Sequence, residues 1–356
     1  MLITGFYVNT YPRHKVLIKA LKDCFIVKEK NYRGKGIFYF FKDIKKSIKN
    51  QDYIFIINSS YKFIFLFFYL SLFTNKTIIY DSFISFYDTF ITDRKRFKKF
   101  SFSGIVAYFL DYLAIRMSDV LVFDTKEHKK YFVDKYNINK DKKKLLVWPV
   151  SLDLKEIDNH LYNSDIDNNI NLYSKEKFNV LFYGTYIPLQ GVDYIVEAAN
   201  ILKDQENIKF ILLGDGQEKN KILNMIKVKN IKNIEVINSV SYNKLFRYIK
   251  KADLCLGIFG DTVKAKRVIP NKVLECLSAN KIVITGKNNT LIEYFTDKKD
   301  IIYCNLADSE DLVKKIMHTY KNYQEITGMV GSARNVIEKY FSFEAIIQNI
   351  KKGLYK

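Results

Sequence analysis

The sequence predicts an α/β protein built from two Rossmann-like, doubly wound parallel-sheet domains. Short apolar runs alternate with segments of helical period along most of the 356 residues, which is the pattern of repeated strand–helix–strand units. A polar stretch at 158–177, rich in Asn, Asp and Ser, separates two halves of similar size. The chain is long enough for two domains, which we place at residues 1–170 and 171–340.

The second half shows the clearer alternation. Its apolar runs are short, and two of them end in glycine, as buried parallel strands often do. Apolar residues at helical spacing follow the first run over 192–202, and a further helix is expected at 242–251. The expected strands are Asn179–Tyr183, Lys209–Leu213, Ile234–Ile237, Leu254–Ile258 and Ile282–Thr285.

The first half repeats this pattern more weakly. A helix is expected to begin at 14–21, directly after the first strand. The expected strands are Leu2–Val8, Asp52–Ile57, Thr77–Tyr80, Val120–Asp124 and Leu145–Pro149.

Composition argues against several functional classes. The net charge is +20, but only 8 of the 58 basic residues are arginine, the residue that reads bases and phosphates bidentately, so no nucleic-acid partner is expected. The four cysteines are far apart and form no CxxC pair, which indicates reduced thiols in a cytoplasmic protein. Residues 1–8 lead directly into a strand with no basic leader.

No metal or other cofactor is expected. No Asp-x-Asp triad stands at a suitable strand end, and the three histidines after the first domain's opening segment, His128, His160 and His318, have no acidic or cysteine neighbours at ligand spacing.

Residues 254–285 carry most of the chemistry. An apolar strand runs into a loop with two glycines and three cations, and a helix containing one carboxylate comes next. Unpaired N–H groups at a helix N-terminus bind phosphate, and the cations strengthen such a site. A carboxylate one turn inside the helix suits the hydroxyls of a ribose. Together these features indicate a nucleotide-linked ligand, and the residues are Gly257, Gly260, Lys264, Lys266, Arg267, Pro270, Asn271, Lys272 and Glu275.

This segment resembles the donor site of the GT-B glycosyltransferases, in particular the retaining family four, or group 1. Members typically carry Glu, seven residues and Glu, and then a small-residue helix and a PVI-like strand. Glu275 matches the second glutamate and residues 279–284 match the helix end and the strand, whereas Arg267 stands at the first glutamate position. The resemblance implies a UDP- or GDP-linked sugar as co-substrate.

A second match covers residues 182–191. The family often has Gly-Arg there, with Lys-Gly five residues later, and Arg and Lys hold the diphosphate. Here these two positions are Thr185 and Gln190, so we infer that Lys264, Lys266, Arg267 and Lys272 neutralise the phosphates instead. Glu275 matches the family motif, and we infer a catalytic group of Arg267, Lys272 and Glu275. The resemblance implies donor contacts at Gly184, Thr185, Gln190, Gly214, Gly216, Phe259, Gly260, Lys264 and Asn271.

The first domain is expected to bind the acceptor. Loops after the carboxyl ends of parallel strands line ligand crevices, and the polar candidates on such loops are Arg13, His14, Asp81 and Asp88. His14 serves equally well as an ordinary helix-start residue. The C-terminal segment 341–356 resembles the closing helix of GT-B chains, which packs back on the first domain.

Two segments bear on membrane contact. The apolar stretch Tyr61–Phe73 is too short to span a bilayer and suits a buried helix. The segment Arg94–Phe100 places five cations and two aromatics before the apolar segment Ile105–Met117, which suits an anionic membrane surface. A solvated loop in a lysine-rich chain is the alternative.

We therefore predict a glycosyltransferase that moves a hexose-type sugar from a nucleotide-diphosphate donor to a glycan or polyprenyl-linked acceptor, with retention. Surface polysaccharide or glycoconjugate synthesis at the inner face of the cytoplasmic membrane is the expected setting. A sugar-nucleotide epimerase on the same scaffold and a non-catalytic GT-B binding protein are the alternatives.

Overall fold

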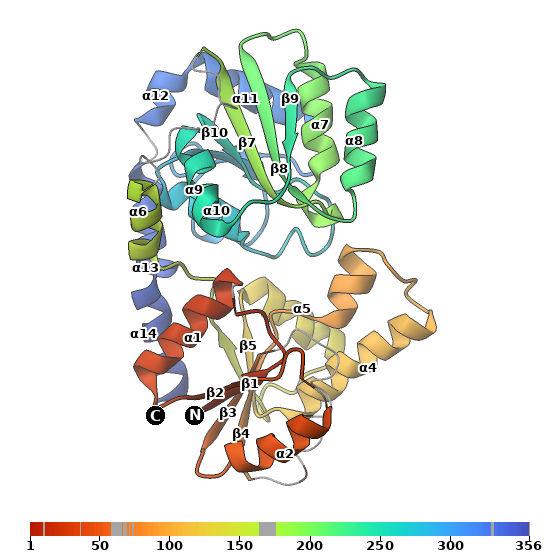
Figure 1. The fold of residues 1–356 in the computed structure, drawn as a ribbon, viewed down its shortest axis with the longest axis vertical. Coiled ribbons are helices and arrows are strands. Elements are labelled where there is room, and N and C mark those ends of the chain that lie inside the picture. The colour runs from red at the N-terminus through yellow and green to blue at the C-terminus, as the bar shows by residue number, and fades with distance from the viewer. Residues whose placement is uncertain are drawn as a thin grey trace. The chain divides into compact units, whose positions relative to one another are not determined.

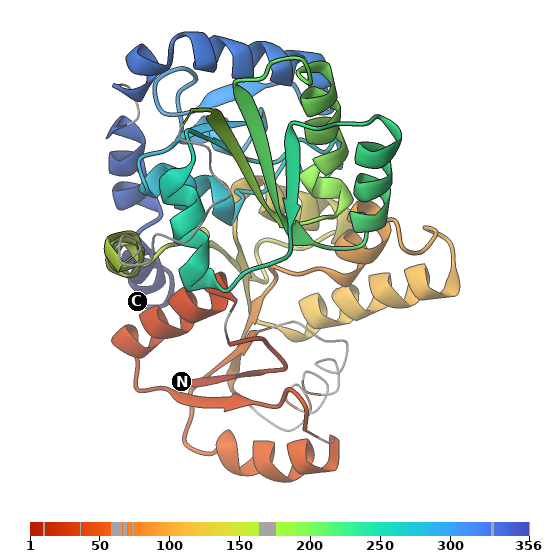
Figure 2. The ribbon, with the colours of Figure 1, turned by 45° about the horizontal axis from the view of Figure 1, so that its top comes forward.

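The computed structural model describes residues 1–9, 11–35, 37–57, 66, 70, 72, 75–163, 176–328 and 331–355. It divides into two compact units, one made of residues 1–152 and 340–356 and the other of residues 153–339. Each unit contains a six-stranded parallel sheet with helices on both faces, which confirms the predicted fold class (Figures 1 and 2). The division lies at 152/153, so the described residues 153–163, which we assigned to the first domain, belong to the second unit.

The first unit has the strand order β2-β1-β3-β4-β5-β6. Its strands are β1 Leu2–Gly5, β2 Lys28–Asn31, β3 Tyr53–Ile57, β4 Thr77–Asp81, β5 Val120–Phe123 and β6 Lys144–Val147. Its helices are α1 Pro12–Cys24, α2 Ile37–Ser47, α4 Phe102–Met117, α5 Lys126–Tyr136 and α14 Phe343–Leu354, with a π-helical segment η1 at Asp88–Asp93.

Two apolar cores lie on the two faces of this sheet. One core joins β-strand side chains to α2, α4 and α5, and the other joins them to α1, α14 and Trp148. The C-terminal helix α14 thus packs beside α1 within the first unit (Figure 1).

The second unit has the order β12-β11-β10-β7-β8-β9, which is the common Rossmann order. Its strands are β7 Phe178–Thr185, β8 Ile208–Asp215, β9 Ile234–Ile237, β10 Leu254–Leu256, β11 Ile282–Gly286 and β12 Ile302–Cys304. Its helices are α6 Leu154–Asn163, α7 Val192–Ile201, α8 Lys219–Val228, α9 Tyr242–Lys251, α10 Asn271–Ser278, α11 Ser309–Lys321, α12 Tyr323–Thr327 and α13 Gly331–Tyr340, with short 3₁₀ turns η2 Pro188–Gln190 and η3 Leu291–Glu293.

Several elements differ from the sequence-based expectation. The edge strands β2 and β12 were not predicted, and the polar sequence of β2, KEKN, carries no apolar signal. The expected linker 158–177 begins inside α6, and its residues 164–175 lie outside the described part of the chain. Most of the apolar stretch 61–73 also lies outside it, so the helix expected there is not assessed.

Candidate functional site

The order of strands in the second unit locates the site. The chain winds outward from β7 in one direction, through β8 and β9, and from β10 in the other, through β11 and β12. Ligands of open α/β sheets bind outside the carboxyl ends of two such central strands, against the loops that follow them. Here those loops are 186–191, after β7, and 257–270, after β10.

Backbone contacts hold the two loops together. The Phe259 N–H donates to the Gln190 carbonyl at 3.0 Å, and the Gly260 N–H donates to the Leu189 carbonyl at 3.3 Å. Gly191 has φ +64°, and a Cβ there would lie 2.4 Å from the Gly260 nitrogen, so only glycine fits at this contact between the two loops. The site therefore has a rigid base made of main chain.

The side chain of Lys272 contacts the loop after β7 next to the point where the two loops meet. It comes from the first turn of α10 and is only 6% exposed. Its Nζ donates to Gln190 Oε1 at 2.5 Å and lies 3.6 Å from the centroid of the Phe182 ring. A Cβ on Gly184 would come within 2.9 Å of the same Nζ, so the glycine leaves space for the ammonium.

The ammonium of Lys272 is not neutralised by an ion pair with any described residue. In the described part of the chain no carboxylate oxygen lies within ion-pair distance of Nζ. Burial lowers the pKa of Lys272 well below its usual value, and the smaller influences of Cys276 and Glu275 act in the opposite direction. Such a cation is costly to keep in a protein interior unless an anion joins it.

Glu275, one turn further along α10, is 3% exposed. Its Oε2 accepts from the Tyr183 hydroxyl at 2.7 Å, and its Oε1 accepts from the Tyr242 hydroxyl at 3.0 Å. Burial raises the pKa of Glu275, while these hydrogen bonds and Lys272 lower it. Two tyrosine hydroxyls therefore cover this carboxylate.

The cationic side chains of the loop after β10 differ in how deeply they are buried. Lys266 pairs with Asp261 at 2.6 Å, with both side chains about half exposed, so it is part of the surface. Arg267 is buried, and Lys264 is half-buried. The Asn288 side chain holds this loop by donating to the carbonyls of Ala265 at 3.1 Å and Val268 at 3.2 Å.

The other predicted donor residues lie along the same edge. Gly184 and Thr185 pair in register with Gly214 and Asp215, and a Cβ on Gly216 would lie 2.5 Å from the Tyr186 carbonyl oxygen. Asn271 opens α10 and is half-buried. The Phe259 side chain belongs to the apolar core, so this residue offers the site its backbone and not its ring.

Tyr183, Tyr242 and Asn288 were not anticipated from the sequence. Tyr183 was included in an expected strand and Tyr242 opened an expected helix, but no pattern in the sequence connects them to Glu275.

A second polar group lies at the carboxyl end of the first unit's sheet. Arg13, on α1, donates from Nη2 to Asp81 Oδ1 at 2.8 Å, and both side chains are buried. Arg13 also donates from Nη1 to the Trp148 carbonyl at 3.1 Å and lies 4.6 Å from the Phe83 ring centroid. Asp81 is thus engaged by Arg13, while the Asp88 backbone N–H donates to Ser85 in a separate hydrogen-bonded group.

His128 belongs to this end of the sheet, contrary to our expectation that it has no acidic neighbour. Its Nδ1 lies 2.5 Å from Oδ1 of Asp124, one helical turn earlier, and its backbone N–H donates to the Thr125 hydroxyl at 2.9 Å. Among the described residues, the buried atoms near this end without a protein partner include Arg13 Nε, His14 Nε2, Ser82 Oγ and His128 Nε2.

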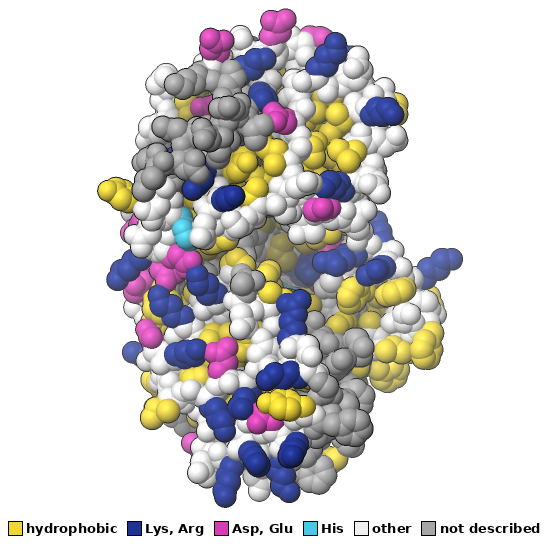
Figure 3. Space-filling model, viewed as in Figure 1, with side chains coloured by type: hydrophobic (Ala, Val, Ile, Leu, Met, Phe, Trp, Pro, Cys, Tyr) yellow, Lys and Arg dark blue, Asp and Glu magenta, His cyan; other side chains and the backbone are white. Residues whose placement is uncertain are grey.

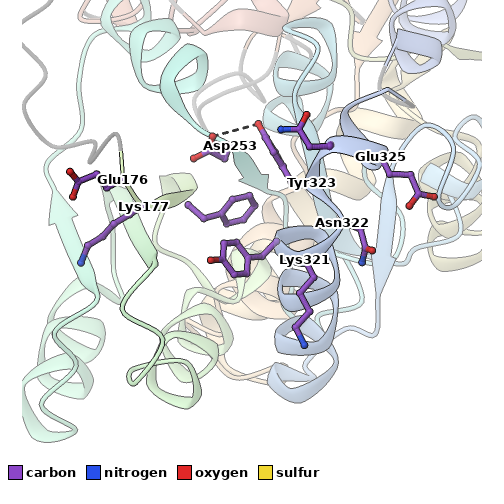
Figure 4. Close-up of a pocket in the computed structure, with 10 residues that line it drawn as sticks. Glu176, Lys177, Asp253, Lys321, Asn322, Tyr323 and Glu325 are labelled. Carbon is purple, nitrogen blue, oxygen red and sulfur yellow. Dashed lines mark hydrogen bonds between the residues drawn. The ribbon is translucent and has the colours of Figure 1, made fainter.

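A separate hollow of the second unit lies at the other end of its sheet. This pocket of about 540 Å³ is lined by the amino ends of β7 and β10 and by α11 and α12 (Figure 4). The Tyr323 hydroxyl points toward Asp253 across it, at 3.5 Å. Because ligands of open α/β sheets bind at the carboxyl ends of the strands, this pocket is distinct from the candidate site.

Two further observations concern the residues that the structure describes. They contain no group of three or more His, Cys, Asp or Glu side chains arranged to hold a metal ion. None of their helices has the length and apolar character needed to cross a membrane.

Comparison with known proteins identifies relatives of the chain. Residues 163–336 match the family model described as Glycosyl transferases group 1. MJ1178 of Methanocaldococcus jannaschii, described as an uncharacterized glycosyltransferase, is 26% identical over 254 residues, which cover 67% of this chain and 66% of that protein. WcaI of Escherichia coli (strain K12), named for a proposed glycosyl transferase role in colanic acid biosynthesis, is 27% identical over 135 residues, covering 37% of this chain and 32% of that protein. The chain thus spans at most about two thirds of these relatives.

Solved structures share the fold. A crystal structure of Anabaena HepE in complex with UDP and glucose has a TM-score of 0.75 at 13% identity, and the match covers 99% of each chain. Sucrose-phosphate synthase from Thermosynechococcus elongatus has a TM-score of 0.73 at 11% identity, covering 99% of this chain and 98% of that one. These likenesses confirm the predicted GT-B fold.

Proposed function

We propose that this chain, whose residues 163–336 belong to the group 1 glycosyl transferases, moves a sugar from a nucleoside diphosphate to a glycan or lipid-linked glycan acceptor. One observation carries the proposal: a buried ammonium, Lys272 Nζ, lies beside Gly184 and Gln190 at the reversal point of the sheet. The complex of HepE with UDP and the name of WcaI support a nucleotide donor and a role in surface polysaccharide synthesis.

The diphosphate of the donor would lie against the Lys272 side chain and the backbone N–H groups that open α10. Gln190 stands where family members often place a lysine, and the Lys272 ammonium donates to its side-chain oxygen. The positive charge is therefore supplied by a residue of α10 instead of a residue of the loop after β7. During transfer the bond between the anomeric carbon and the diphosphate oxygen breaks as the acceptor oxygen bonds to that carbon, and the proton of the acceptor hydroxyl passes to the departing diphosphate. Negative charge then grows on the diphosphate, and a preorganised cation stabilises it most at that stage. We expect retention of configuration and no bound metal.

The ribose would be recognised by Glu275 through an exchange of partners. Tyr183 lies in β7, whereas Tyr242 opens α9 and is only partly buried. A ribose hydroxyl that donates to Oε1 would replace the Tyr242 hydroxyl, while the Tyr183 hydroxyl stays on Oε2. The carboxylate remains fully hydrogen-bonded in both states, which avoids the penalty of a buried unsatisfied charge.

The acceptor would use the polar group of the first unit. His128, oriented by Asp124, and the Arg13–Asp81 pair offer a hydrogen-bond acceptor and a donor to sugar hydroxyls. We place the reaction at the cytoplasmic face of a membrane.

The experiment compares Glu275→Gln with Tyr242→Phe in calorimetric titrations with UDP and GDP. Loss of a hydrogen bond to a charged group costs about 1.5–3 kcal/mol, so Glu275→Gln should weaken binding about 10–150-fold. Tyr242→Phe removes only the competing hydroxyl and should bind the nucleotide at least as well as the unmodified protein. Equal weakening in both variants would mean that the carboxylate is only structural, and the ribose assignment would then be wrong.

A further inference from the structure

The surface around the start of α4 exposes an unusual number of large apolar side chains. We define the α4 face as residues 94–109, which comprise the segment after η1 and the first half of α4. Phe100 and Phe102 are 84% and 83% exposed, and Phe109 is 54% exposed. The other exposed apolar side chains on this face are Phe97, Ile105 and Val106. Contiguous apolar surface of this kind marks an interaction site.

The exposed residues form one stripe along the helix. Positions 102, 105, 106 and 109 follow helical spacing, so their side chains share one face. The opposite face, with Ala107, Asp111 and Ala114, is buried against the first unit. The stripe is therefore an outward surface of a helix whose inner face is already packed.

Positive charge borders the stripe. Lys95, Arg96, Lys98 and Lys99 are exposed, and Arg94 is half-buried. Between residues 94 and 118 the single acidic residue is Asp111, which is buried and adds no negative surface charge. Figure 3 shows lysine and arginine side chains at the border of a hydrophobic patch over α4.

The cationic segment packs directly on the helix. A Cβ on Gly104 would lie 2.7 Å from the carbonyl oxygens of both Lys98 and Lys99, so this glycine allows the segment to cross the first turn of α4. The Ser101 hydroxyl caps that turn by accepting from the Gly104 N–H at 3.2 Å. Cations and apolar stripe thus form one continuous surface.

Asp111 anchors the helix beneath this surface. Its Oδ2 accepts from the Ser85 hydroxyl at 2.6 Å, the Tyr87 N–H at 2.9 Å and the Tyr136 hydroxyl at 3.0 Å. Its Oδ1 accepts from the Phe86 N–H at 3.0 Å. A helix held by four hydrogen bonds on its inner side presents its outer stripe without needing to rearrange.

We propose that the α4 face binds the surface of an anionic lipid bilayer, with the aromatic side chains in the headgroup layer and the exposed cations on the lipid phosphates. The charge argues for a membrane over a second copy of the chain, because two copies of a face with four exposed cations and no exposed acid repel each other. An amphipathic helix with bordering lysines and phenylalanines lies in the interface plane without crossing the bilayer. This inference goes beyond the proposed transfer reaction and stands if that reaction is wrong.

The first test removes four positive charges from the α4 face. A control variant with the same net charge loses four positive charges from a different surface. One variant replaces Lys95, Arg96, Lys98 and Lys99 by serine, and its control replaces four exposed lysines around α2, Lys42, Lys45, Lys46 and Lys49, by serine. Both are measured by flotation with phosphatidylcholine vesicles that contain or lack equimolar phosphatidylglycerol. Each cation contributes about fivefold to partitioning, so the α4 variant should bind anionic vesicles roughly 10²–10³-fold more weakly, while the control stays near the unmodified protein. Equal losses in the two variants would overturn the placement on α4.

The second test removes apolar surface. Phe100, Phe102 and Phe109 are replaced by serine, and the control replaces two exposed apolar residues of α8, Leu223 and Val228, by serine. The α4 variant should lose vesicle binding by at least tenfold even at low salt, and the control should not. Unmodified protein that ignores anionic vesicles at low salt, or that dimerises through this face instead, would refute the proposal.

Discussion

Replacing Lys272 by methionine tests the central claim about the donor site. Methionine keeps the length and apolar stem of the side chain and removes the ammonium that contacts Gln190 at 2.5 Å. A charged hydrogen bond is worth about 1.5–3 kcal/mol, so UDP should bind about 10–150-fold more weakly. Uridine, which has no phosphates, should bind equally to both proteins, because Lys272 would touch only the diphosphate.

The matched control is Lys266→Met in the same loop. Lys266 is about half exposed and pairs with Asp261, so its loss should leave the UDP affinity within about twofold, since a surface ion pair contributes little. Isothermal titration with UDP and uridine measures all the required values. Lys272→Met protein that binds UDP like the unmodified chain would refute phosphate binding by this residue, and equal weakening toward uridine would show a structural effect.

The same variant should change the pH dependence of stability. Burial lowers the pKa of Lys272 in the folded state, whereas the unfolded chain keeps a value near 10.5. Between these two pKa values the unfolded state binds more protons, so this lysine makes the free energy of unfolding rise with pH. Lys272→Met removes that contribution, and its stability relative to the unmodified protein should fall as pH rises toward 10.5 in urea unfolding experiments. A pH-independent difference would contradict the buried, destabilised ammonium.

Two further predictions concern the first unit. Burial raises the pKa of Asp111 from 3.8 to about 6. The protonated side chain therefore adds about 3 kcal/mol to the free energy of unfolding below pH 4, and this contribution is lost as the pH rises to about 6. Urea unfolding should show this decrease in the unmodified protein and not in Asp111→Asn. His128→Gln should lower the turnover of donor and acceptor about 10–10²-fold while leaving the Kd for UDP unchanged, because His128 would meet only the acceptor. Unchanged turnover, measured as UDP release, would exclude His128 from the reaction.

Much of the fold could be predicted from apolar periodicity. Strand β9 and helix α9 have the predicted bounds, Ile234–Ile237 and Tyr242–Lys251, because three of the four residues of β9 are apolar and α9 has a regular amphipathic pattern. Strand β2 escaped prediction, since its four polar residues lie at an edge where only backbone pairing with β1 defines the strand. Periodicity reports burial, and an exposed edge strand buries little.

Less of the candidate site could be predicted from the sequence. Motif spacing located Lys272 and Glu275, but not the tyrosines that cover Glu275, because they come from β7 and α9, distant in sequence and joined only by the fold. The Asp124–His128 pair did leave a local signal. A strand ends at Phe123, Thr125 caps the next helix, and the spacing of four places the histidine over the aspartate.

Because Lys272 lies in a packed helix, its side chain loses less conformational entropy when a ligand binds. A lysine on a mobile loop loses rotamer freedom worth up to about 2 kcal/mol when it closes on a ligand. The side chain of Lys272 is confined by Phe182, Gly184 and Gln190, so this loss has already occurred when the protein folds. A phosphate that reaches Nζ meets a cation already in place, and the ordering entropy lowers the stability of the fold instead of the affinity for the ligand.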